Sequence, residues 1–140
     1  MAVLGSYFTA QGMNGWYESL VLPALTPSGS VISAAWTVIF VLFATSLLTL
    51  WNLPGRGASL ENVLVLAVIV GVATVSWSYF FFVKHQIGAA LFTAVVIEIS
   101  VLLLIGSVWR YSTAAGALLL PYAGWVAFAI YLNYLILALN

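Results

Sequence analysis

The sequence predicts an all-α membrane protein, a single domain in which a bundle of transmembrane helices follows a short or truncated first helix. Of the 140 residues, 65% are hydrophobic and 4% are charged, whereas soluble domains carry about 25% charged residues. Four segments of about 20 apolar residues, the length that crosses a bilayer, are separated by short breaks. Because no water reaches backbone groups in lipid, such segments are expected to be helical.

The segments follow one another along the chain. Residues 1–12 are apolar but about half as long as a bilayer crossing, so they are expected to form a partial helix. Residues 13–30 contain Pro23, Pro27 and Gly29, which interrupt a regular helix, so a structured loop is expected there. The four complete spans are expected at residues 31–51, 62–83, 86–109 and 113–139.

The connections between the spans are short. Residues 52–61 include Pro54 and Gly57, which favour turns, and residues 84–85 and 110–112 form the other two breaks. Tight connections of this kind place consecutive helices side by side and antiparallel, which predicts a bundle.

Composition excludes several classes of function. The formal net charge is zero, so a nucleic-acid partner, which requires clustered Lys and Arg, is not expected. The chain has one His and neither Asp nor Cys, so a zinc site and a Ser-His-Asp triad are not expected either. We expect no metal and no cofactor. The expected location is a prokaryotic cell membrane, with lipid around most of the surface of a multi-pass protein.

Aromatic residues recur at helical spacing on three spans, and the loop before the first of them carries Trp16 and Tyr17. Flat aromatic walls with little charge suit a large, flat, apolar ligand. Packing of the same rings inside the bundle explains the spacing equally well, so the residues alone leave both a pocket and a packed interior open. The pairs placed on common helix faces are Trp36 with Phe40, Thr74 with Trp77, and Trp125 with Ala129.

Polar residues within the spans have structural and functional interpretations. Glu98 lies near the middle of its span, where a carboxyl is a functional hypothesis by default. We favour the structural interpretation, in which it bonds to a neighbouring helix. Asn133 is likewise expected to bond across helices, and Tyr122 to brace Trp125.

Ala67 and Gly71 form a pair of small residues at a spacing that lets helices approach closely. This pair suits either a dimer face or the edge of the pocket, and only one of the two roles can dominate.

Four blocks of residues, in chain order, resemble the TspO/translocator protein family, the tryptophan-rich sensory proteins, from about residue 8 to residue 140. The resemblance implies a bundle of five transmembrane helices, usually a homodimer. It also implies a pocket for porphyrins and other large apolar ligands beneath the first loop. The blocks are Trp16-Tyr17-x-x-Leu20-x-x-Pro23-x-x-x-Pro27, Trp36-Thr37-x-x-Phe40, Trp77-Ser78-x-Phe80-Phe81, and Pro121-Tyr122-x-x-Trp125-x-x-Phe128-Ala129-x-x-Leu132-Asn133.

The resemblance also implies roles for individual residues. Some family members degrade porphyrin oxidatively through a pair of tryptophans, and these would be Trp36 and Trp125 here. The functions that follow are a receptor or carrier for tetrapyrroles, a porphyrin-degrading enzyme, or a structural subunit that packs against other membrane proteins. By position, the implied ligand contacts are Trp16, Tyr17, Pro27, Ile32, Trp36, Phe40, Thr74, Trp77, Trp125 and Ala129.

Overall fold

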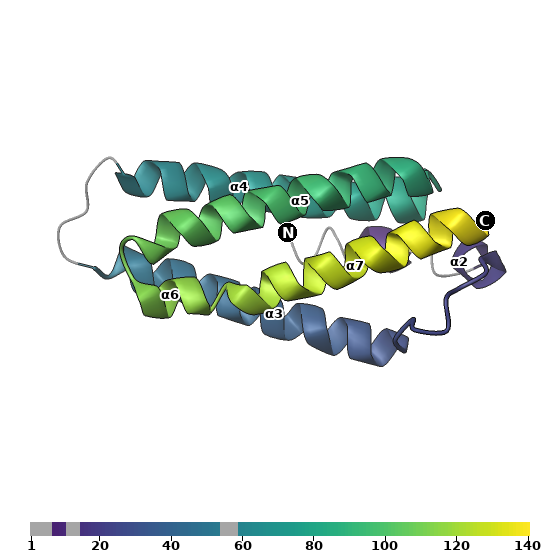
Figure 1. The fold of residues 1–140 in the computed structure, drawn as a ribbon, viewed down its shortest axis with the longest axis horizontal. Helices are drawn as coiled ribbons and strands as arrows, with labels where there is room; N and C mark the ends of the chain where they lie inside the picture. The colour runs from purple at the N-terminus through teal and green to yellow at the C-terminus, as the bar shows by residue number, and fades with distance from the viewer. Residues whose placement is uncertain (1–6, 11–14, 54–58) are drawn as a thin grey trace.

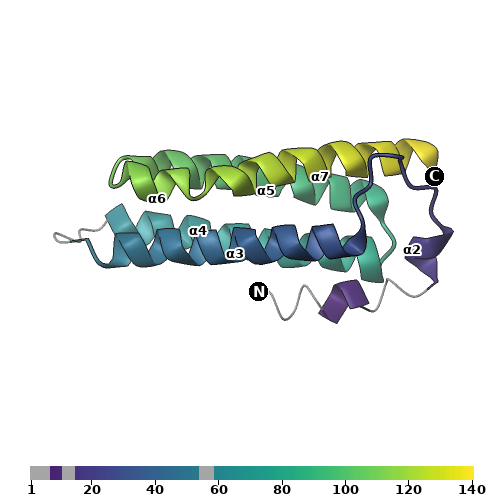
Figure 2. The same cartoon turned by 90° about the horizontal axis from the view of Figure 1, so that it is seen from below.

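The computed structural model describes residues 7–10, 15–53 and 59–140. In these residues the regular structure is helical, without strands, which confirms the predicted all-α class. Four helices are long and apolar enough to cross a membrane, and they lie alongside one another in an elongated bundle (Figures 1 and 2). The four helices are Gly29–Trp51, Leu60–Val83, Ile87–Trp109 and Thr113–Leu139.

The first span, α3 (Gly29–Trp51), begins two residues before the expected position. It follows a loop that contains the short helix α2 (Trp16–Ser19). Of the expected N-terminal partial helix, residues 7–10 are helical, and the rest of segment 1–12 lies outside the described residues. This helical turn contacts the bundle through the ring of Phe8, whose centroid lies 5.5 Å from that of Tyr79.

The second span changes its helical form at its C-terminal end. Helix α4 (Ser59–Ser78) continues as a π-helical turn, η1 (Tyr79–Val83). The wider turn is visible in the backbone hydrogen bonds, because the amide of Lys84 donates to the carbonyl of Tyr79, at 3.0 Å. The span predicted over residues 62–83 corresponds to Leu60–Val83, and its last turn is π-helical. Single π-turns of this kind are frequent at functional sites.

The last span has the expected bounds, residues 113–139, and it is interrupted near its start. Helix α5 (Ile87–Trp109) leads into α6 (Thr113–Ala117), which ends before α7 (Leu120–Leu139) begins. Pro121 lies in the first turn of α7. A proline there lacks the amide proton that a continuous helix would need and its ring crowds the carbonyl four residues earlier, so the helix breaks.

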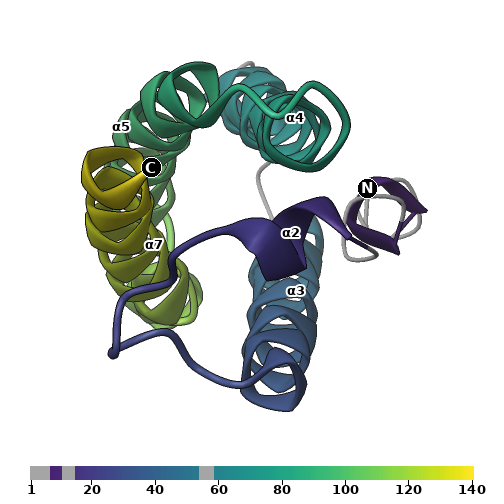
Figure 3. The same cartoon turned by 90° about the vertical axis from the view of Figure 1, so that its right-hand side faces the viewer.

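The larger cluster of buried residues extends to the end of the bundle away from α2, and a smaller one, with Phe81, Phe82 and Ala90, lies beside α2. Viewed along the bundle, α4, α5 and α7 follow an arc, and α3 stands diagonally across from α5 (Figure 3). Side chains that are almost fully buried gather where α6 meets the other helices, and Ser46 on α3 donates a hydrogen bond to the carbonyl of Ala115 there, at 2.8 Å. Among them are Leu50, Val63, Leu104, Val108 and Leu119.

The first ten residues of α3 have no buried side chain, since the buried residues of this helix are Ile39, Ser46 and Leu50. The N-terminal part of α3 is therefore held less firmly than its C-terminal part. Ala67 and Gly71 on α4 are both buried within the described chain, so the interpretation of this pair as a dimer face was wrong.

The loop between α2 and α3 is fastened to the end of α7. Asn140 accepts a hydrogen bond from the amide of Val21 at 2.9 Å and donates one to the carbonyl of the same residue at 3.1 Å. The two bonds give the Val21 backbone a pair of partners like those in a β-ladder, although the loop has no strand. We call residues 20–28 the lid loop, because it crosses the end of the bundle beside α2 (Figure 3).

Candidate ligand-binding cavity

A cavity of about 510 Å³ opens among α3, the C-terminal part of α4 with η1, α5 and α7, next to the lid loop. Ligand pockets for drug-sized molecules span about 300–1,000 Å³, so this cavity is large enough for one. It lies in the half of the bundle where α3 has no buried side chains. None of the residues that line it in the described chain carries a charge.

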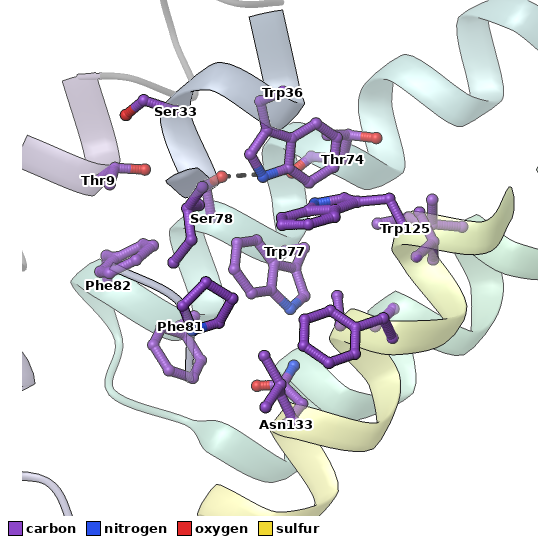
Figure 4. Close-up of a pocket in the computed structure, with 18 of the residues that line it drawn as sticks. Thr9, Ser33, Trp36, Thr74, Trp77, Ser78, Phe81, Phe82, Trp125 and Asn133 are labelled. Carbon is purple, nitrogen blue, oxygen red and sulfur yellow. Dashed lines mark hydrogen bonds between the residues drawn. The ribbon is translucent and has the colours of Figure 1, made fainter. Parts of the chain in front are cut away.

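The structure places nine of the ten expected ligand contacts on the wall of this cavity. Those on the long helices come from α3, α4 and α7, so the spacing of the aromatic residues corresponds to a shared hollow and not only to packing (Figure 4). The nine are Tyr17, Pro27, Ile32, Trp36, Phe40, Thr74, Trp77, Trp125 and Ala129.

Trp16, which the resemblance placed among the ligand contacts, does not line the cavity. Its indole stacks on the imidazole of His85, with centroids 4.2 Å apart and an angle of 10° between the rings, and meets the edge of Phe81. Trp16 and Tyr17 are successive residues of a helix, so their side chains point about 100° apart and only one of them faces the cavity. Trp16 fastens α2 to the break before α5 instead.

The indole of Trp36 is held from behind by a hydrogen-bonded pair. The ring of Tyr122 meets Trp36 edge to face, with centroids 5.9 Å apart, and contacts Phe43 in the same way. The hydroxyl of Thr74 donates to the carbonyl of Val70 and lies 2.8 Å from the Tyr122 hydroxyl, so the phenol is the donor of that second bond. Tyr122 thus braces Trp36, and the prediction that it braces Trp125 was wrong.

The other two indoles form further walls. Trp77 stacks on Phe81, with centroids 5.3 Å apart and 15° between the rings, and Trp125 contacts Phe128 on its own helix. Trp125 also borders a second, more open hollow between α3 and α7.

The cavity also contains residues that the sequence analysis did not select. Phe82 lines it because the π-turn brings two successive phenylalanines inward, and a regular helical period could not show this. Thr26 comes from the lid loop, where there is no periodicity to follow. Asn133 was expected to bond across helices, but its amide nitrogen is buried, has no hydrogen-bond partner and lines the cavity.

The polar groups of the cavity are few. Burial raises the pKa of Tyr17 on α2 above its ordinary value. Among the described residues, no three side chains of His, Cys, Asp or Glu come together in a way that could hold a metal ion. The carboxyl of Glu98 lies outside the cavity lining, and its Oε2 is buried without a partner, so the expected bond to a neighbouring helix is wrong for that oxygen.

Comparison with known proteins gives the same family over the whole chain. The model of the TspO/MBR family matches residues 1–139. The chain is 32% identical to the tryptophan-rich protein TspO of Chlorobaculum tepidum, over 97% of this chain and 86% of that protein. It is 33% identical to the protein of the same name from Archaeoglobus fulgidus, over 97% and 87%. The translocator protein of Ovis aries is 30% identical, over 91% and 76%.

The bacterial and archaeal relatives agree with the predicted multi-pass protein of a prokaryotic membrane. A family match along nearly the full chain, four spans and two relatives above 30% identity lead to one conclusion. This chain belongs to the TspO/MBR family.

Proposed function

We propose that this membrane protein binds a porphyrin, or another large flat apolar molecule, in the cavity beside the lid loop and acts as a receptor or carrier for it. The observation that carries the proposal is the presence of three indoles, Trp36, Trp77 and Trp125, from three different helices on the wall of one uncharged cavity. Aromatic rings bind flat apolar molecules by stacking and by edge-to-face contact.

The size and lining of the cavity support this ligand class. About 510 Å³ accommodates most of a tetrapyrrole ring, and ligand pockets are typically apolar with a few polar groups that fix orientation. The loosely held N-terminal part of α3 allows the wall that carries Trp36 to adjust to a larger ring.

The experiment is a titration of protoporphyrin IX into the detergent-solubilised protein, followed by the absorbance of the porphyrin. We expect saturable binding in the parent and a loss of affinity of roughly tenfold in each of Trp36→Leu and Trp125→Leu, because each substitution removes an aromatic wall. Trp109→Leu is the matched control, since Trp109 does not line the cavity. Equal binding by the parent and both cavity variants would contradict the proposal.

A second candidate function is the breakdown of a bound porphyrin by molecular oxygen, which is the oxidant, with light as a possible source of activation in the bound pigment. It is favoured by one observation, that Trp36 and Trp125 both line the cavity. Formation of product in the dark, above a control without protein and lost in Trp36→Phe and Trp125→Phe, would support this activity. Binding without such product would leave a receptor or carrier.

A further inference from the structure

Helix α2 is held against the end of the bundle by the rings of its first two residues. The indole of Trp16 stacks on the imidazole of His85, with centroids 4.2 Å apart and 10° between the ring planes. The ring of Tyr17 meets that of Phe82, with centroids 6.0 Å apart, and lines the cavity. No residue of α2 is buried, and the helix has no side-chain cap. The place of Tyr17 on the cavity wall therefore depends on the contact between Trp16 and His85.

His85 is the fixed partner in this contact. The backbone on both sides of it is hydrogen-bonded, since the amide of Lys84 donates to the carbonyl of Tyr79 at 3.0 Å and the amide of Gln86 donates to that of Phe80 at 2.9 Å. Among the described residues, His85 is the one residue other than glycine with a positive φ, at 56°. This left-handed conformation is uncommon for a residue with a side chain. The chain between η1 and α5 thus presents the imidazole to α2 from a defined position.

The strength of the stack can change with pH. Histidine is the side chain that ordinarily gains or loses its charge between about pH 5 and pH 8. A neutral imidazole attracts an indole by dispersion, whereas an imidazolium over the face of an indole adds a cation–π attraction. The side chain of His85 is exposed and lies between two spans, outside both of them, so it exchanges protons with water.

The other charged groups at this end come from α2 and from the chain after η1. Glu18 on α2 is exposed, and its negative charge favours the imidazolium. Lys84 is adjacent to His85 and disfavours it, although its ammonium lies over the ring of Tyr79, 5.6 Å from the centroid. The phenol of Tyr17 is the remaining titratable group of α2, and burial raises its pKa above the ordinary value. Neither α7 nor the first turn of α5 has a charged side chain. Because Glu18 and Lys84 oppose each other, the indole of Trp16 sets the sign of the effect.

We propose that His85 is a pH-sensitive positioning residue, which holds α2 and the ring of Tyr17 more firmly at the cavity when its imidazole is protonated. The inference rests on the proposed function, because it concerns the exchange of a ligand in the same cavity. With the proton bound, the imidazolium attracts the indole of Trp16 more strongly and the ligand leaves more slowly. With the proton lost, α2 loosens and exchange is faster. Acid therefore retains the ligand, and a neutral to alkaline pH releases it.

The first measurement requires no ligand. The chain has a single histidine, so imidazole signals in an NMR titration belong to His85 and show when it gains its proton. Hydrogen exchange at the amides of Ser19 and Leu20, whose hydrogen bonds form the turn of α2, shows how firmly α2 is held. Protection factors remove the intrinsic pH dependence of exchange. We expect protection at about pH 6 to exceed that at about pH 8 by about two- to fivefold, the ratio that an exposed cation–π contact gives.

Three variants separate the stack from other effects of pH. His85→Asn has no charge and tolerates the left-handed backbone, so protection should be low at both pH values. His85→Arg carries a permanent flat cation that stacks on an indole, so protection should be high at both. Lys84→Gln is the matched control, because its ammonium contacts Tyr79 and not the stack, and it should retain the pH dependence of the parent.

The second measurement is the dissociation rate of etioporphyrin, which has no ionisable group at its edge and so brings no edge charge that changes with pH. We expect the rate from the parent to rise by about two- to fivefold between about pH 6 and pH 8. The rate from His85→Asn should be the faster one at both pH values. Trp16→Leu should also lose the pH dependence, since its imidazolium has no indole to attract.

Two results would overturn the role of His85. One is equal protection of α2 in the parent at both pH values while the NMR signals show that His85 has titrated. The other is a pH dependence of protection that persists in His85→Asn, which would assign it to another group. A parent that binds no porphyrin at either pH contradicts the proposed function instead, and the exchange of the α2 amides still decides whether His85 positions α2.

Discussion

The hydroxyl oxygens of Thr74 and Tyr122 lie 2.8 Å apart and join α4 to α7 behind the indole of Trp36. Thr74 has a second partner in the carbonyl of Val70, whereas the Tyr122 hydroxyl has Thr74 as its hydrogen-bond partner in the described chain. Both side chains are buried. The pair is therefore asymmetric, and the two partners should respond differently to substitution.

We expect Thr74→Val to destabilise the protein more than Tyr122→Phe. Tyr122→Phe removes one buried hydrogen bond and leaves Thr74 satisfied, which costs about 1 kcal/mol. Thr74→Val leaves the phenol buried without a partner, which costs about 1–3 kcal/mol. Thermal unfolding in detergent measures both, and the reverse order would contradict the assigned direction of the bonds.

Ala129→Phe should close the cavity from the side of α7. The added ring occupies space that a ligand needs, so we expect at least a tenfold loss of porphyrin affinity with little change in the unfolding temperature. Ala127→Phe is the matched control, because Ala127 lies on the exposed face of the same helix. If both variants bind equally well, the cavity is not where the ligand binds.

Asn140→Ala should loosen the lid loop without altering the cavity wall. The substitution removes both hydrogen bonds to Val21, and we expect faster hydrogen exchange at the Val21 amide and a ligand dissociation rate raised by a few-fold, equivalent to about 1 kcal/mol. Asn140→Asp retains the acceptor and should give an intermediate rate. Exchange at Val21 that does not change in either variant would show that the loop is held by other contacts.

Trp16→Leu separates the role found in the structure from the role that was expected. Because Trp16 stacks on His85 and does not line the cavity, its loss should free α2 and speed ligand exchange while equilibrium affinity changes by less than about threefold. Stopped-flow kinetics and titration of the same sample measure the two quantities. A tenfold loss of affinity at unchanged rates would restore Trp16 as a direct ligand contact.

Two glycines should respond in opposite directions to alanine. A Cβ at Gly116 would lie 2.5 Å from Cε3 of Trp109, so Gly116→Ala forces that indole to move and should destabilise the protein by about 1–3 kcal/mol. Gly124 has open space at the same position, and Gly124→Ala should be neutral or stabilise α7 by up to about 1 kcal/mol. Unfolding temperatures of the two variants provide the comparison.

The sequence was sufficient for the class of fold and for part of the cavity wall. Apolar length marks a membrane span without reference to the rest of the chain, and the 3.6-residue period places Trp36 beside Phe40 and Trp125 beside Ala129. Apolar length and helical period both depend only on neighbouring residues, so the predictions made from them do not require knowledge of the tertiary contacts.

The remaining features depend on geometry that a regular period does not contain. Phe82 reaches the cavity through the π-turn, and Trp16 leaves it because α2 turns only one of two successive rings inward. The amide nitrogen of Asn133 is unsatisfied because the facing helices place no hydrogen-bond acceptor beside it. The hydrogen bonds between Val21 and Asn140 join residues 119 positions apart. A short stretch of sequence, read by its periodicity, therefore does not predict these contacts.

The uneven burial of α3 has a consequence for how such a protein can diverge. Its C-terminal half is secured by Ser46 and Leu50 in the packed end of the bundle, whereas the half that borders the cavity has no buried side chain before Ile39. Substitutions that reshape the cavity therefore fall where the fold tolerates them best. Related proteins could therefore diverge in the ligand that they bind while the packed end of the helical bundle is retained.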